Sequence, residues 1–273
     1  MSDLIETHAV SLEAAGYSPI TIAARIKLLR RISRDVAPGL DASAAELAAW
    51  FSPYDGWTLY THWHHANGFY TWACAGRTPH FDYNPMSELV RPRTPYHEPN
   101  PMPDDEIARA LQMLREPWRR AVLIATLQGL RCAEICRLDR EHINPSTLFV
   151  DRKGGSTQLL PTHPDVWTEL SRLPPGPVVR RRRGQRFSPN HLTNSVSFVL
   201  TRMGLPDGTL HRFRASFATR LADAGVHVTV IQDLMGHRSL KSTQGYIKVR
   251  DEKRRLAIQS LLVPTTGNLQ EAA

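Results

Sequence analysis

Apolar residues recur every three or four positions along residues 19–37, which is the spacing of one face of an amphipathic helix. Arginines interleaved with this stripe form either a solvated outer face or a surface that meets phosphates. A shorter apolar pattern over residues 42–51 predicts another helix, with Ser43 or Asp41 as its N-cap. We therefore expect residues 1–88 to form a small helical domain.

Aromatic residues are concentrated in residues 58–76, again at spacings close to three and four. This periodicity predicts that they pack into a helical core rather than stack on bases. His62, His64 and His65 lie in the same stretch, but histidines at these positions do not all face one way along a helix. No carboxylate follows them three or four residues later, so we expect no metal site there.

Five prolines fall within residues 89–104, where they remove backbone donors and disfavour helix at the preceding positions. This composition predicts an extended linker between two domains. Arg91 and Arg93 lie on it and are placed to contact phosphate.

The second domain is expected over residues 105–273. An apolar run over residues 120–130 predicts a buried helix, and alternating residues over 147–163, interrupted by Gly154 and Gly155, predict a β-hairpin. Further helices are expected at residues 188–202, 212–224, 229–235 and 239–249. The predicted fold class is therefore mainly α with a small β-sheet, a helical domain being followed by an α+β domain.

Charge separates the two domains. The chain has 273 residues and a net charge of +8, yet residues 1–100 contain 8 Lys and Arg against 10 Asp and Glu, whereas residues 101–273 contain 26 against 16. The basic surplus of the second domain favours a polyanionic partner, without specifying any chemistry.

Membrane and secreted classes are not favoured. No apolar run approaches the roughly 20 residues that span a bilayer, and the first residues lack the basic start of a signal peptide. The three cysteines, Cys74, Cys132 and Cys136, form no even disulfide framework and are expected to be small buried thiols in a reducing compartment. We therefore expect a cytoplasmic protein without a membrane partner.

Four short segments of the second domain carry the candidate chemistry. They are Gly129–Glu134 (GLRCAE), Asp151–Gly155 (DRKGG), His211–Arg214 (HRFR) and Met235–His237 (MGH), the last followed nine residues later by Tyr246. In this order, and over more than a hundred residues, they resemble the catalytic boxes of the tyrosine site-specific recombinases, or phage integrases.

The resemblance covers residues 104–250 and implies a tyrosine-recombinase catalytic domain with a C-terminal oligomerisation tail over residues 105–273. Less specifically, residues 1–88 are similar to the family's core-binding (SAM-like) DNA-binding domain. The two domains would clamp DNA from opposite faces. The chain opens on the helical domain, so no separate arm-binding domain is expected.

The resemblance implies that Arg131 and Arg214 hold the non-bridging oxygens of a DNA phosphate. Two permanently charged guanidiniums suit this role, because attack on the phosphodiester adds negative charge to those oxygens. His211 would position or deprotonate the attacking phenol, and His237 would donate to the same phosphate. For Arg131 an ion pair with Glu134 or Asp139 is the structural alternative.

Tyr246 is the one tyrosine of the second domain and the implied nucleophile. A phenol has an ordinary pKa of about 10, so it needs cationic neighbours or a base. Lys153 is implied as the general acid that protonates the departing 5′-oxygen, with the adjacent Arg152 as a rival. A 3′-phosphotyrosine keeps the bond energy, so neither a cofactor nor a metal is expected.

The implied partners are double-stranded DNA at attachment or core sites and further copies of the chain, monomeric when free and tetrameric on DNA. A host bending protein or directionality factor would belong to the same system, in the cytoplasm of a bacterial host. The arginines expected against DNA are Arg25, Arg30, Arg34, Arg91, Arg93, Arg152, Arg180, Arg181, Arg182 and Arg183.

A phage integrase is therefore the expected function, and the motifs do not separate it from a chromosome-dimer resolvase of the same family. A catalytically silent DNA-binding protein would have lost a catalytic residue, whereas all six positions are filled. A type IB topoisomerase shares the chemistry but usually acts as a monomer. The apolar stripe over residues 256–262, typical of an oligomerising tail, favours the recombinase.

Overall fold

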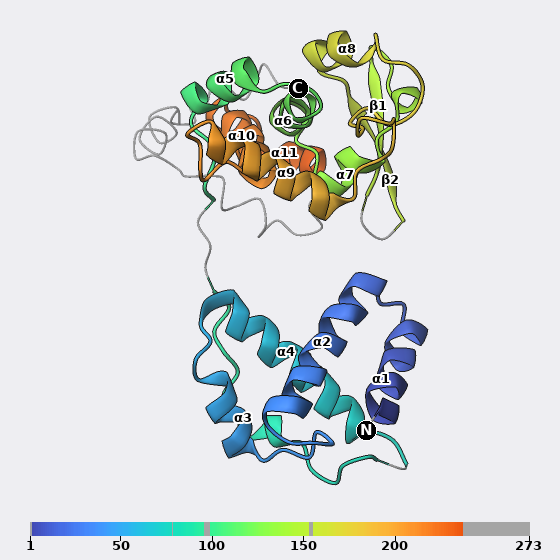
Figure 1. The fold of residues 1–273 in the computed structure, drawn as a ribbon, viewed down its shortest axis with the longest axis vertical. Helices are drawn as coiled ribbons and strands as arrows, with labels where there is room; N and C mark the ends of the chain where they lie inside the picture. Colours follow the sequence, from blue (N-terminus) through green and yellow to red (C-terminus); the bar gives the residue numbers. More distant parts are fainter. Residues whose placement is uncertain (1, 78, 96–98, 153–154, 237–273) are drawn as a thin grey trace, which may run out of the picture. The chain divides into compact units, whose positions relative to one another are not determined.

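The computed structural model describes residues 2–77, 79–95, 99–152 and 155–236. The chain divides into two compact units, Met1–His97 and Glu98–Ala273, each with a hydrophobic core of its own (Figure 1). As the sequence predicts, the described residues are mostly helical, with one small two-stranded sheet. None of their helices is both long and apolar enough to cross a membrane.

The first unit is a group of helices around a single core. Ser18 caps the second helix by accepting a hydrogen bond from the Thr21 N–H, and a capping box between Ser43 and Glu46 starts the third. The N-cap of this third helix is therefore Ser43 and not Asp41. The described elements are α1 (Ser2–Ala14), α2 (Pro19–Asp35), α3 (Ala44–Phe51), α4 (Gly56–Ala73) and the 3-10 helix η1 (Pro85–Ser87).

Trp63, Phe69 and Tyr70 of α4 are buried in this core, as their spacing predicts, whereas Tyr60 is only half-buried. Phe69 and Tyr70 are fully buried, and the Tyr70 hydroxyl donates to the Leu40 carbonyl over 2.9 Å. Two of the three clustered histidines lie against aromatic rings: the His62 ring centroid is 4.7 Å from that of Tyr54, and the His64 centroid is 4.3 Å from that of Tyr60. These contacts give both histidines a packing role.

The second unit combines helices with the hairpin. The strands β1 (Thr147–Asp151) and β2 (Thr157–Pro161) are antiparallel, and Leu148 pairs with Leu160. The other described elements are α5 (Asp104–Met113), α6 (Trp118–Gln128), α7 (Cys132–Arg137), the 3-10 helix η2 (Arg140–His142), α8 (Pro164–Leu170), α9 (Pro189–Arg202), α10 (Leu210–Asp223) and α11 (Val228–Met235).

Helix α6 is the centre of this unit. Its residues Ala121, Val122, Ile124 and Ala125 are fully buried, because α5 and α10 pack on one side of it and α7 and α8 on the other (Figure 1). A helix enclosed in this way has no need of a polar face, which explains its continuous apolar run.

The predicted hairpin and the predicted helices that fall within the described residues agree with the structure to within three residues at each end. The helix expected at residues 239–249 lies outside the described residues. The short helices α7 and α8 were not predicted, because fewer than eight residues hold too little periodicity to read. All three cysteines are free; Cys136 is buried as expected, whereas Cys74 and Cys132 are half-buried.

His8 on α1 is an unusual member of the first core. It is 2% exposed and lies between Phe69 and Trp72, at ring-centroid distances of 5.3 and 4.6 Å. Neither of its ring nitrogens has a hydrogen-bond partner in the described part of the chain. Burial, with a smaller contribution from the nearby Arg25 charge, lowers the pKa of His8 to about 4.

We predict that the first unit loses stability as pH falls from about 6.5 to about 4. The pKa of His8 is lower in the folded state than in the unfolded chain, so protons bind preferentially to the unfolded chain in this window. Urea unfolding followed by tryptophan fluorescence should show a shallower pH dependence for His8→Phe, by up to about 3 kcal/mol. His80→Phe, at an exposed histidine, is the control; equal pH dependence in His8→Phe and wild type would contradict the prediction.

Candidate active site

Arg131 is placed by a tight turn between α6 and α7. Gly129 ends α6 in the left-handed conformation, with φ of 63°, and a Cβ atom at this position would collide with the ring of Phe217 on α10. The turn buries Leu130 in the core and makes Arg131 the N-cap residue of α7. The glycine is therefore required by both its backbone angle and its neighbour.

The head group of Arg131 is fixed on two sides. Its Nη1 donates to Glu134 Oε1 over 2.8 Å, and its Nη2 donates to the Gly236 carbonyl over 3.1 Å. Its backbone N–H donates to Glu134 Oε2 over 2.8 Å, which closes a capping arrangement at the start of α7. Because 36% of the side chain stays exposed, this guanidinium is both anchored and open to an anion from solvent.

Arg214 reaches the same place from α10, a helix that begins where Thr209 accepts a hydrogen bond from the Arg212 N–H. Its guanidinium is almost completely buried and donates to the carbonyls of Gly129 and Met235. His211, three residues earlier on the first turn of α10, is exposed. The structure thus brings Arg131 and Arg214 together, with His211 on the helix that supplies Arg214.

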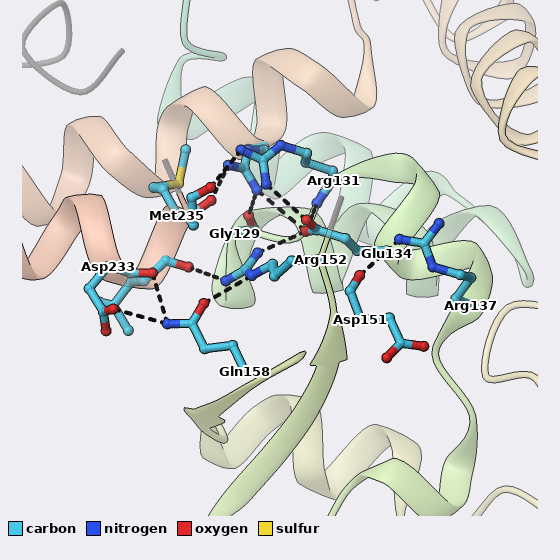
Figure 2. A network of polar contacts seen from close by, with 12 residues as sticks. Gly129, Arg131, Glu134, Arg137, Asp151, Arg152, Gln158, Asp233 and Met235 are labelled. Atoms are coloured by element: carbon cyan, nitrogen blue, oxygen red, sulfur yellow. Dashed lines mark hydrogen bonds and ion pairs between the residues drawn. The ribbon is translucent and has the colours of Figure 1, made fainter. Parts of the chain in front are cut away.

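Glu134 is the shared partner of these arginines. Its carboxylate is 3% exposed, and Arg131, Arg152 and Arg214 approach it to 2.8, 3.0 and 3.7 Å. Burial on its own would raise the pKa of Glu134, but the Arg131 N–H and the charges of Arg152 and Arg131 outweigh it, and the pKa is lowered. Glu134 is therefore an anion at neutral pH and balances part of the cationic charge around it (Figure 2).

The remaining acceptors are carbonyls at the ends of two helices. Gly129 is the C-cap of α6 and Gly236 is the C-cap of α11, both in the left-handed conformation. The last carbonyls of a helix lack partners within the helix and carry partial negative charge, so cations are stabilised there. Arg131 and Arg214 exploit this by donating to the carbonyls of Gly129, Met235 and Gly236.

Arg152, which follows β1, joins the same network. Its side chain is nearly buried and donates to Glu134, to the side chain of Gln158 on β2 and to the Leu234 carbonyl of α11 (Figure 2). Neighbouring Lys153 lies outside the described residues, as do His237, Tyr246 and the apolar stripe at residues 256–262.

The arginines of the first unit that are expected against DNA lie mainly on its surface. Arg30 and Arg34 are exposed and form ion pairs with Glu6 and Asp35 at 3.0 and 2.7 Å, and the half-buried Arg25 lies over the ring of Tyr17. Exposed pairs of this kind contribute little to stability, so they can be exchanged for a phosphate. Arg91 and Arg93 are exposed as well.

The four-arginine run of the second unit forms the tip of a small turn. Arg180 and Arg186 pair across an antiparallel bridge, and the Arg181 N–H donates to the Gln185 carbonyl over 2.8 Å. Arg181, Arg182 and Arg183 are all exposed at this tip. Three adjacent guanidiniums on a hydrogen-bonded turn make a compact cationic surface.

Sequence reasoning offered Glu134 only as one of two possible ion-pair partners of Arg131, and missed that three arginines share it. The spacing of Arg131 and Glu134 is that of a capping box, in which an acid three residues after the N-cap accepts the N-cap N–H, and this signal could have selected Glu134 over Asp139. The contact of Glu134 with Arg152, 18 residues away, has no such signal.

Residues 101–253 match the model of the phage integrase family, whose motifs the second unit carries. The chain belongs to the phage integrase family. These proteins are tyrosine site-specific recombinases, and the match covers more than half of the chain.

Curated family members are similar at about 30% identity. Tyrosine recombinase XerA of Pyrococcus horikoshii is 29% identical over 185 residues, 63% of this chain and 65% of that protein. XerA of Thermococcus kodakarensis is 33% identical over 62% of this chain and 65% of its own length, and XerC of Mesorhizobium japonicum is 33% identical over 59% of each. The aligned part is thus less than two thirds of the length of each of these three relatives.

Solved integrase structures share the fold. A lambda integrase dimer bound to a COC' core site matches with a TM-score of 0.74 at 18% identity, over 97% of this chain and 79% of that one. The XerH recombinase bound to its difH substrate matches with a TM-score of 0.68 at 15% identity, over 94% and 83%. At these identities the likeness establishes a lambda-integrase-like fold.

We predict that Glu134→Gln destabilises the second unit by about 3–5 kcal/mol, because the substitution leaves buried guanidiniums without their counter-charge. Urea unfolding at pH 7 would measure this loss. Asp105→Asn, at an exposed carboxylate on α5, is the control and should change the free energy of unfolding by less than about 1 kcal/mol. A loss of less than about 1 kcal/mol in Glu134→Gln would show that the carboxylate does not hold the arginines together.

Proposed function

We propose that this protein is a site-specific DNA recombinase that cuts and rejoins DNA strands through a phosphotyrosine at Tyr246. The observation that carries the proposal is the meeting of Arg131 and Arg214 on one buried carboxylate, in a chain of this family. Both guanidiniums also donate to helix-end carbonyls: Arg131 to that of Gly236, and Arg214 to those of Gly129 and Met235.

The arginine pair would bind the scissile phosphate. Arg131 offers the exposed part of its guanidinium, while the buried Arg214 adds a fixed positive charge behind it. Attack on phosphorus adds negative charge to the non-bridging oxygens, and a preorganised cationic site stabilises that charge without having to rearrange. His211 and His237 are the proposed additional donors, as their positions in the family motifs imply.

The covalent step conserves one phosphodiester bond. The Tyr246 oxygen would attack phosphorus while the bond from phosphorus to the 5′-oxygen breaks, giving a 3′-phosphotyrosine and a free 5′-hydroxyl. Lys153 would supply the proton that the departing 5′-oxygen takes up. In the reverse step a 5′-hydroxyl attacks the phosphotyrosine, so rejoining needs no external energy source.

The proposed partners are double-stranded DNA carrying a core site and further copies of the chain. One structural relative is a lambda integrase tetramer bound to a Holliday junction, with a TM-score of 0.69 at 19% identity. By analogy we propose a tetramer on DNA. The cationic turn of Arg181, Arg182 and Arg183 and the exposed arginines of the first unit are the proposed phosphate contacts.

Integration of a phage genome is the finer proposal. An integrase joins two DNA molecules that carry unlike sites, whereas a dimer resolvase acts between two copies of one site. Plasmid pairs of both kinds therefore distinguish the two activities once the sites are known.

We predict that wild-type protein forms a covalent adduct with DNA and that Tyr246→Phe does not. The proteins would be incubated with nicked suicide duplexes from a library of candidate attachment sites, in the presence of EDTA, and separated under denaturing conditions. Tyr83→Phe, at an exposed tyrosine of the first unit, is the matched control and should form the adduct. A cognate site that is bound without any adduct in the wild type would favour a non-catalytic DNA-binding protein.

We predict that replacing Arg181, Arg182 and Arg183 together by Gln weakens DNA binding and flattens its salt dependence. The slope of log affinity against log salt should decrease in magnitude by about 2–3, since each lost phosphate contact removes about 0.9. Binding isotherms at several salt concentrations give this slope. Arg172→Gln, at an exposed arginine outside the turn, is the control, and an unchanged slope in the triple variant would place the turn away from DNA.

A further inference from the structure

Arg152 occupies the point where the hairpin meets the rest of the second unit. It directly follows the last residue of β1, and its backbone N–H donates to the Ser156 carbonyl over 2.7 Å across the turn. Its side chain turns inward and is 8% exposed. A cationic side chain beside a β-turn is ordinarily solvated, so its burial here requires an explanation.

The guanidinium of Arg152 connects three separate segments. Nη1 donates to Glu134 Oε2 over 3.0 Å, Nη2 donates to the Leu234 carbonyl over 2.9 Å, and Nε donates to Gln158 Oε1 over 3.0 Å. The planar fork of arginine suits this geometry, because its donors point in fixed and divergent directions. A lysine carries all its donors on one nitrogen and cannot reach three acceptors that lie in these divergent directions.

Gln158 completes a second bond between the same segments. While its oxygen accepts from Arg152, its Nε2 donates to both the carbonyl and the side-chain Oδ1 of Asp233, at 3.1 Å each (Figure 2). Arg152 and Gln158 together thus attach both strands of the hairpin to the last turn of α11.

The packing around Arg152 is close on the side of α11. A Cβ atom added to Gly236 would lie 2.7 Å from both Cζ and Nε of Arg152. The backbone angle of Gly236, with φ of 58°, disfavours a side chain for a second reason. The Arg152 fork is therefore closely packed between the described part of the hairpin and the end of α11.

A position inside the protein is a poor one for reading DNA, although Arg152 belongs to the same basic run as Lys153. Each donor group of its guanidinium is hydrogen-bonded to the protein, and the counter-charge is Glu134, which also holds Arg131. Glu134 therefore contacts both Arg131, which is proposed to bind the phosphate, and Arg152, which anchors the hairpin that carries the proposed general acid.

We propose that Arg152 is a positioning residue that fixes the β1–β2 hairpin, and with it the general acid Lys153, relative to the Arg131–Arg214 pair. The proposal rests on the proposed function. Arg152 itself touches neither DNA nor the reacting atoms. It acts through the placement of its chain neighbour, and Gln158 shares the role by holding β2 to α11.

The experiment measures single-turnover cleavage of nicked duplexes that carry the site mapped by adduct formation. One duplex has the ordinary 5′-bridging oxygen at the scissile phosphate, and the other has sulfur there. A thiolate needs no proton in order to leave, because the pKa of a thiol (about 8.5 for cysteine) is far below that of an alcohol. The sulfur duplex therefore reports cleavage without a general acid.

The variants are Arg152→Lys, which keeps the charge and loses the fork, and Gln158→Met, which leaves Arg152 in place. Arg137→Lys is the matched control, because Arg137 is exposed and donates to the Asp151 carbonyl on the same strand without entering the network around Glu134. DNA affinity is measured for each variant, and thermal unfolding verifies that each is folded.

We expect Arg152→Lys to cleave the oxygen duplex about 10- to 100-fold more slowly than wild type, since a misplacement of about 1 Å can cost about 100-fold. Its DNA affinity should equal that of wild type, and its rate on the sulfur duplex should recover to within about threefold. Gln158→Met should behave in the same way with a smaller loss, and Arg137→Lys should match wild type.

Three results would overturn the proposal while leaving the proposed function intact: a wild-type rate in Arg152→Lys, a slow rate that the sulfur duplex does not restore, or a rate that falls together with DNA affinity. The last would make Arg152 a DNA contact. If wild-type protein cleaves neither duplex, the proposed function fails and this proposal fails with it.

Discussion

The second unit is organised around a charge that cannot be buried alone. An ionised carboxylate at the depth of Glu134 costs several kcal/mol unless it is paired and hydrogen-bonded, and the same holds for the guanidiniums of Arg152 and Arg214. Each compensates the others, and the four groups come from α7, the end of β1, α10 and the turn after α6. Arg131 and Glu134 are local partners, whereas the buried charges of Arg152 and Arg214 are compensated only where their segments meet Glu134.

Much of the fold could be predicted because the relevant physics is local. The enclosed helix α6 shows a continuous apolar run, the hairpin shows alternation interrupted by Gly154 and Gly155, and α3 shows its capping box. The short helix α7 offers no such period. Its start is set by the left-handed turn at Gly129, and the Phe217 ring that leaves no room for a side chain at this turn comes from a helix far along the chain.

The candidate site could be predicted only in part, because many of its contacts join residues that are far apart in the sequence. The motifs pointed to Arg131, Arg214 and His211 as candidates, and the structure brings the first two together. They did not indicate that Arg152 is buried, because its partner at Leu234 is 82 residues away, nor that Arg131 reaches the Gly236 carbonyl 105 residues away. An arginine in a basic run looks like a surface residue until the tertiary contacts that bury it are known.

Most of the oxygen atoms that hold the three arginines are main-chain atoms, from Gly129, Leu234, Met235 and Gly236. A carbonyl persists whichever side chain its residue carries, so the anchoring is encoded by the path of the backbone and by a few glycines that permit it. Such a site tolerates extensive sequence drift. Under the proposed function, a lineage could exchange the surfaces that select its DNA target while inheriting the same chemistry unchanged.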